Sequence, residues 1–157
     1  MVTKKVARKL EKASKILKRR GCVTVGELAE LLKINKGQAG YLARLLSSYG
    51  GAVKPVAGVL CHPTCADCVY REVAEAVCQQ ISSSRGRVVM LALADLSEKV
   101  FYDKTPALSK ALYRLLKSLL DGSIVEERKK RLSLVVDINL AREKLGCNNI
   151  ATLQPTN

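Results

Sequence analysis

The chain has 157 residues, of which 48% are hydrophobic, and its formal net charge is +13. No apolar run approaches the roughly 20 residues of a membrane span, and one Phe, five Tyr and no Trp are too few aromatic rings for a single-strand stacking surface. The composition therefore predicts a soluble cytoplasmic, nucleoid-associated protein with a polyanionic partner and no membrane contact.

The positive charge is concentrated in the first part of the chain. Residues 1–60 hold 13 Lys and Arg against 3 Asp and Glu, a net charge of +10, whereas residues 61–157 hold 14 against 11, a net charge of +3. A basic surface that serves only solubility would not be distributed so unevenly. The asymmetry favours a nucleic acid over an acidic protein or a membrane surface as the partner, bound mainly by the first part of the chain. The scarcity of aromatic rings favours double-stranded DNA over a single strand.

The first 20 residues have the spacing of an amphipathic helix. This helix is predicted over 4–19, with Gly21 ending it, and a short strand follows at Val23 and Val25. Its only acid is Glu11, against nine cations, which is more positive charge than solubility requires. The apolar face of the helix comprises Val6, Leu10, Ala13, Ile16 and Leu17.

Two further helices are predicted from their N-terminal caps. Thr24 and Glu27 have capping-box spacing, and Asn35 and Gln38 repeat it, so helices should start after Thr24 and after Asn35. Gly50-Gly51 ends the third helix. The residues expected in the core are Leu28, Leu31, Leu32, Leu42, Leu45, Leu46 and Tyr49, and a hairpin around Lys54-Pro55 is expected over 52–60.

The rest of the chain predicts a second series of the same elements. In order, these are a helix over 69–83, a strand at Val88-Val89, a helix over 91–99, a helix from Thr105-Pro106 to Leu120, a hairpin from Ile124 to Ile138 and a last helix capped by Asn139 that ends near Gly146. Lys129-Lys130-Arg131 is expected at the tip of the hairpin.

The two series are related by an internal repeat. Residues 20–31 match 85–96 at a constant offset of 65, and residues 44–48 match 114–118 at an offset of 70. The second copy therefore has about five extra residues between its second and third helices.

This order of elements resembles the winged helix-turn-helix superfamily. The closest residues are 24–32, Ile34-Asn35 and 42–46, and the resemblance covers 4–60 and 69–145. It implies a mostly α fold with small β-hairpins, built as two tandem winged helix-turn-helix domains, and a DNA-binding function. The implied organisation is a strongly basic DNA-reading domain at 1–61, a Cys-rich junction at 62–68, a second domain at 69–146 and a polar tail at 147–157.

The third helix of the first domain would then read the major groove. Its buried leucines leave free a stripe of Lys36, Gln38, Tyr41, Arg44 and Ser48. Gln suits adenine and Arg suits guanine because each can make a paired contact to a base edge, and Lys36 at the helix start suits a phosphate. Phosphate contacts are also expected from the first helix, at Lys9, Lys12 and Arg19.

The second copy carries weaker candidates for DNA contact. Lys110, Tyr113, Arg114 and Lys117 could face DNA from its third helix, and Lys129, Lys130 and Arg131 could form a wing that reaches the phosphate backbone. Glu126 and Glu127 lie beside that wing, so a homodimer or protein-partner surface is the alternative.

Six cysteines are many for such a chain, and Cys61, Cys65 and Cys68 lie close together beside His62. Their spacing is that of a radical-SAM iron–sulfur motif, but the chain lacks the length and the alternating strands and helices of that barrel. Cys78 is a poor fourth ligand, because ten helical residues place it about 15 Å along the axis from Cys68 and about 80° around it. It falls instead on a core stripe.

Winged-helix topology pairs the first strand with the last, which brings Cys22 to Cys61. We therefore predict a metal site at Cys22, Cys61, Cys65 and Cys68 that holds zinc, with an iron–sulfur cluster as the alternative ligand group. A Cys22–Cys61 disulfide, or buried thiols with no cofactor, remain the other interpretations.

Two functions are consistent with these features. The first is a transcription regulator that reads duplex DNA, and the alternative is a non-catalytic tandem winged-helix accessory subunit of a transcription, replication or translation machine. We expect no enzymatic activity, because the sequence shows no paired carboxylates, no Ser-His-Asp set and no phosphate-binding glycine loop.

Overall fold

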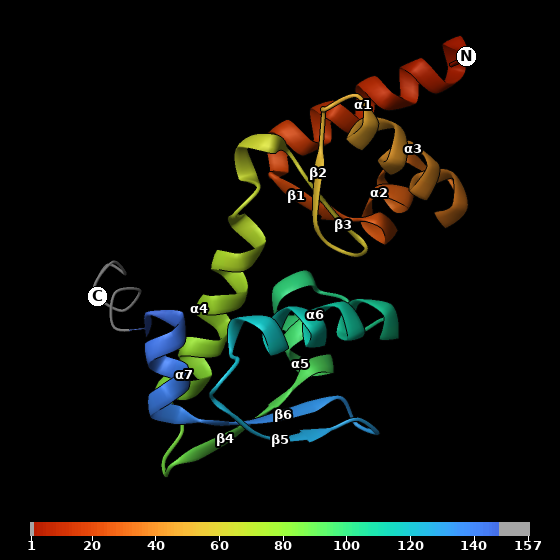
Figure 1. Ribbon diagram of the computed structural model, residues 1–157. Coiled ribbons are helices and arrows are strands. Elements are labelled where there is room, and N and C mark those ends of the chain that lie inside the picture. Colours follow the sequence, from red (N-terminus) through yellow and green to blue (C-terminus); the bar gives the residue numbers. More distant parts are fainter. Residues whose placement is uncertain (1, 148–157) are drawn as a thin grey trace. The chain divides into compact units, whose positions relative to one another are not determined.

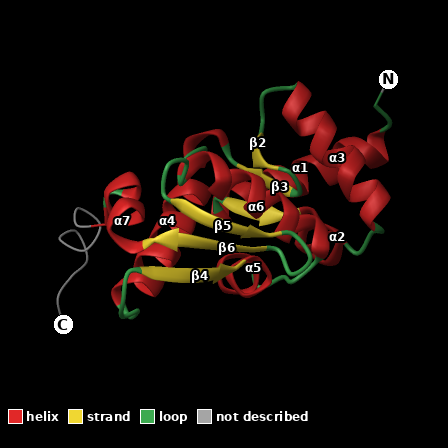
Figure 2. Ribbon diagram, turned by 60° about the horizontal axis from the view of Figure 1, so that its bottom comes forward, coloured by secondary structure: helices red, strands yellow, loops and turns green. Residues whose placement is uncertain are grey.

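The computed structural model describes residues 2–147 (Figure 1). It is mostly helical with two small antiparallel three-stranded sheets, which confirms the prediction of an α-rich fold with small β-hairpins (Figure 2). The chain divides into two compact units, Met1–Tyr70 and Arg71–Asn157, and the division falls within helix α4 (Cys68–Ser82). Over the described residues, no helix combines the length and the apolar character needed to cross a membrane.

The first unit contains three helices and a sheet before α4 begins. Its elements are α1 (Lys4–Arg20), β1 (Cys22–Thr24), α2 (Val25–Leu32), α3 (Lys36–Ser48), β2 (Val53–Val56), β3 (Val59–Cys61) and the 3-10 turn η1 (Pro63–Cys65). The strand order is β1-β3-β2. Cys22 is paired with Cys61 and Thr24 with Val59, so the first strand meets the last as the winged-helix topology implied.

Both predicted capping boxes are present. The Thr24 hydroxyl accepts from the Glu27 backbone N–H at 3.0 Å, and the Glu27 carboxylate accepts from the Thr24 N–H at 3.2 Å. At α3, the Asn35 side-chain oxygen accepts from the Gln38 N–H at 2.8 Å, and Gln38 Oε1 accepts from the Asn35 N–H at 3.3 Å. Each box satisfies two backbone donors near the helix start that have no partner inside the helix.

Four expectations for the first unit are wrong. Val25, expected in the strand with Val23, is instead the first residue of α2. Leu31 is 41% exposed and Tyr49 is 65% exposed, although helical spacing placed both in the core. Tyr49 is the C-cap of α3, so it lies beyond the last turn that packs on the core. The hairpin turns at Gly58, with a φ of +86°, and not at Lys54-Pro55. Pro55 instead lies in the edge strand β2, where a missing backbone N–H is tolerated.

The second unit repeats the order helix, strand, helix, helix, hairpin and adds a last helix. After α4, its elements are β4 (Val88–Ala92), α5 (Leu93–Phe101), α6 (Pro106–Leu119), β5 (Ile124–Arg128), β6 (Ser133–Asp137) and α7 (Ile138–Leu145). The strand order β4-β6-β5 has the same pattern as the first sheet. Lys129, Lys130 and Arg131 lie in the turn between β5 and β6, as predicted.

Some helix starts in the second unit differ from the prediction. The cap of α7 is Asp137, whose carboxylate accepts from the Leu140 N–H at 2.9 Å, and not Asn139. Strand β4 extends to Ala92, so α5 starts at Leu93 and not at 91. Thr105 precedes Pro106 at the start of α6 as expected, but its side chain makes no capping hydrogen bond.

Candidate nucleic-acid interface and cysteine cluster

Helix α3 has one buried and one exposed face. Ala39, Leu42, Ala43 and Leu46 are buried, and three of them belong to the core that α1, α2 and the sheet share. On the other side Lys36 and Arg44 are exposed, and Tyr41 is 45% exposed. Among residues 2–147, neither Lys36 nor Arg44 forms a salt bridge. These three side chains are therefore available to a ligand.

Two other residues of the predicted stripe are already engaged. The Gln38 amide oxygen accepts the Asn35 N–H in the capping box, and it is the same oxygen that a paired contact to adenine would use. The Ser48 hydroxyl donates to the Leu45 carbonyl at 2.8 Å. Arg44 is therefore the residue of this face best prepared for a paired contact to a base.

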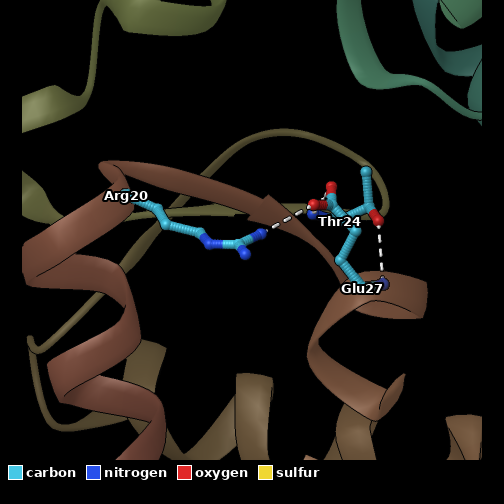
Figure 3. A network of polar contacts seen from close by, with 3 residues as sticks. All are labelled: Arg20, Thr24 and Glu27. Carbon is cyan, nitrogen blue, oxygen red and sulfur yellow. Dashed lines mark hydrogen bonds and ion pairs between the residues drawn. The ribbon is translucent and has the colours of Figure 1, made fainter. Parts of the chain in front are cut away.

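Helix α1 carries most of the unpaired positive charge of the first unit. Only two of its nine cations form ion pairs within the described chain: Lys15 with Glu11 at 3.8 Å, and Arg20 with Glu27 at 3.3 Å. Figure 3 shows the second pair, in which the Glu27 carboxylate receives both the Arg20 guanidinium and the Thr24 backbone N–H. The seven other cations include the predicted phosphate contacts; Lys12 and Arg19 are exposed and Lys9 is half-buried.

The cations predicted to contact DNA from the second unit fall into two groups. Lys117 is held by Glu127 at 2.9 Å, and this hydrogen bond and charge raise the pKa of Lys117 and lower the pKa of Glu127. Lys110 is exposed, as are the three hairpin-tip cations Lys129, Lys130 and Arg131. In the second unit, an ion pair within the chain therefore neutralises one of the cations that were predicted to contact DNA.

All six cysteines form disulfides: Cys22–Cys61, Cys65–Cys68 and Cys78–Cys147. The first joins the paired ends of β1 and β3, with a Cα–Cα distance of 4.0 Å. The second spans the start of α4, with a Cα–Cα distance of 5.1 Å. The Cys22 sulfur lies 3.8 Å from the Cys65 carbonyl oxygen, so these two disulfides are neighbours.

The structure thus brings together the four cysteines that were predicted as ligands. Cys78 is buried in the second unit, where Cys147 is its partner. Sequence reasoning missed Cys147, which it assigned to the polar tail; the rest of that tail, 148–157, lies outside the described residues. In the described part of the chain, no group of three or more His, Cys, Asp or Glu side chains is arranged to hold a metal. Zinc or an iron–sulfur cluster at the four thiolates stays a prediction.

Comparison with known proteins adds one structural likeness. No protein-family model and no curated protein matches the chain. The crystal structure of a hypothetical protein from Pyrobaculum spherical virus is similar, with a TM-score of 0.59 and 16% sequence identity. The likeness covers 88% of this chain and 99% of the viral one. At this identity it concerns the fold alone.

Proposed function

We propose that the protein is a transcription regulator that binds double-stranded DNA through two winged helix-turn-helix units, with α3 as the helix that enters the major groove. The observation that carries this proposal is the exposed face of α3, on which Lys36, Tyr41 and Arg44 lie opposite a fully packed side. A surface helix with free cations, preceded by a short turn and a second helix, is the element that such proteins insert into DNA.

The repeated topology supports the winged-helix assignment. Each unit has the order helix, strand, helix, helix, strand, strand, and in each sheet the last strand lies between the other two. The hairpins β2–β3 and β5–β6 take the place of the wings. In the second unit, the three exposed cations at the hairpin tip would contact the phosphate backbone in this proposal.

Each candidate residue of α3 has a role that its chemistry suits. Arg44 has a planar guanidinium that can donate to both O6 and N7 of guanine. Lys36, the first residue of α3, is suited to a phosphate, which the positive end of the helix dipole also favours. Gln38 keeps its oxygen in the cap and retains an amide nitrogen to donate, and Tyr41 can donate its hydroxyl to a phosphate.

Helix α1 supplies sequence-independent attraction in this proposal. Lys9, Lys12 and Arg19 neutralise phosphates and release counterions, so affinity should fall steeply as salt rises. The cations of the second unit contribute less, because Glu127 engages Lys117 and Glu126 engages Arg128.

Those same ion pairs favour a second candidate function. A wing flanked by glutamates suits a protein surface better than DNA, which is consistent with an accessory subunit whose first unit holds nucleic acid without sequence preference. In that case the second unit would bind another subunit or a second copy of the chain.

A DNA titration of the full chain separates the two functions. Fluorescence anisotropy with duplexes selected from a random pool, compared with unselected duplexes, gives the specificity ratio. We expect Arg44→Ala to reduce this ratio, whereas Arg114→Ala, at the equivalent position of the second copy, should reduce it less. Equal binding of selected and unselected duplexes by the wild type would favour the accessory subunit, and no binding at all would reject both functions.

A further inference from the structure

The first unit has a basic hollow between α1 and α2, with a volume of about 430 Å³. Cationic side chains of α1 border it, and aliphatic side chains of both helices form its apolar part. No residue of α3 lines it. The lining residues are Lys12, Lys15, Ile16, Arg19, Leu31 and Leu32.

The second unit has an acidic hollow of about 240 Å³ at the corresponding place, between α4 and α5. Tyr102, the C-cap of α5, lines this hollow, and 90% of its surface is exposed. The pKa of Glu72 is raised, first by its burial and then by the charge of Glu75. Lys99 also lines the hollow but forms no salt bridge among the described residues, so two carboxylates face one cation there. The lining residues are Glu72, Glu75, Ala76, Gln79, Lys99, Val100 and Tyr102.

On the side of the first helix of each unit, the two hollows occupy equivalent positions in the repeat. In each hollow, four lining residues come from the first helix of the unit, and their spacing is the same. They are residues 12, 15, 16 and 19 in α1 and residues 72, 75, 76 and 79 in α4. The buried residues of these helices keep the same offset of 60, with 13, 16 and 17 in α1 and 73, 76 and 77 in α4. The caps Lys33 and Tyr102, which follow the second helix of each unit, share a left-handed backbone with a φ of +56°. The two hollows differ in the sign of the charge that predominates in their lining.

We propose that the acidic hollow of one copy of this chain docks on the basic hollow of a second copy. Tyr102 packs its ring on the exposed Leu31 and on Leu32. Glu75 pairs with Lys15, and Glu72 pairs with a neighbouring cation of α1. The Lys15–Glu11 pair within one copy is long and highly exposed, so Lys15 can exchange this partner at little cost.

The charge of each hollow determines which other hollow it can bind. Two basic hollows repel each other, and so do two acidic hollows. Favourable association is therefore expected only between a basic hollow and an acidic one. Each copy carries one of each, so the acidic hollow of any copy can bind the basic hollow of another. An exposed tyrosine that becomes buried against leucines is also a typical energetic centre of a protein interface.

The docking does not use the face of α3 that we assign to DNA. Lys12 and Arg19 border the basic hollow and are also predicted phosphate contacts, so the decisive variants avoid them. Lys15, Glu75 and Tyr102 belong to the proposed contact and to no proposed DNA contact. Association is therefore measured on the full chain without DNA, and its failure leaves the proposed function untouched.

Sedimentation velocity at low and high ionic strength tests the proposal. We expect wild-type protein to associate at low salt and to dissociate as salt screens the charges. Lys15→Glu and Glu75→Lys should each weaken association by at least about tenfold, and the double variant should recover it, because the exchanged charges attract again. Circular dichroism on each variant verifies that the fold is kept.

A matched pair of tyrosine variants tests the apolar part. Tyr102→Ala should weaken association, whereas Tyr49→Ala, which removes another exposed tyrosine at a helix C-cap, should not. A wild type that stays monomeric at low salt, a double charge exchange without recovery, or equal effects of the two tyrosine variants would each overturn the proposal.

Discussion

Gly21 lies directly against the sulfur of Cys65. A Cβ atom on Gly21 would approach Cys65 Sγ to 3.0 Å, and Gly21 itself has a φ of +85°. The residue also donates its N–H to the Leu17 carbonyl, which ends α1, and its own carbonyl accepts from the His62 N–H at 2.7 Å. One glycine thus connects the end of α1 to the segment that carries the cysteines.

Gly21→Ala should therefore destabilise the first unit by about 1–3 kcal/mol. The left-handed backbone strains any residue with a Cβ, and the new methyl group would also meet Cys65. Gly50→Ala is the control, because Gly50 has a φ of +76° with no atom within 4 Å of an added Cβ. Chemical denaturation of both variants should show the larger loss for Gly21→Ala; equal losses would mean that the proximity of Cys65 contributes nothing.

Removal of three cations from α1 should weaken DNA binding on every sequence. In the variant Lys9→Ala, Lys12→Ala, Arg19→Ala, we expect the slope of log affinity against log salt to decrease by about 0.9 for each phosphate that is no longer neutralised. The control removes three exposed cations of the second unit, Arg85, Arg87 and Lys104, and should change the slope less. An unchanged slope in the α1 variant would show that this helix does not bind phosphates.

Gln38 can be tested without loss of its cap. Gln38→Glu keeps a side-chain oxygen for the Asn35 N–H but adds a negative charge at the DNA-facing end of α3. We expect an unchanged melting temperature and a lower affinity for DNA. Gln38→Ala should instead remove the cap hydrogen bond, at a cost of about 0.5–1.5 kcal/mol in stability. Wild-type affinity in Gln38→Glu would place this end of α3 away from DNA.

Metal and thiol analysis can determine whether the cysteines bind zinc or form disulfides. In protein prepared without oxygen and with a reductant, we expect one zinc ion bound by Cys22, Cys61, Cys65 and Cys68, released by Cys22→Ser and retained by Cys78→Ser. In protein prepared with oxygen, thiol titration after unfolding should find no free cysteine, because all six are paired. Reduced wild type without zinc would contradict the metal site and leave the disulfides as the function of these residues.

The sequence predicted features that depend on near neighbours. Thr24 with Glu27 and Asn35 with Gln38 define helix starts because capping is local, and both boxes are present. The Cys78–Cys147 bond spans 69 residues, and no local pattern connects its ends. Leu31 has helical spacing like its buried neighbours, but which side of a short helix meets the core depends on α1 and α3. The exposed face of α3 could be predicted from the helical periodicity of its leucines. That Gln38 and Ser48 on this face already make hydrogen bonds within the chain could be seen only from the structure.

The three disulfides join the cysteines in strict chain order, first with second, third with fourth and fifth with sixth. Six cysteines allow fifteen pairings, and this one contains no crossed or nested rings. Each ring closes with residues of its own unit alone. During synthesis, the first unit can therefore complete its covalent links before the second has left the ribosome, and the arrival of later cysteines requires no earlier bond to be exchanged.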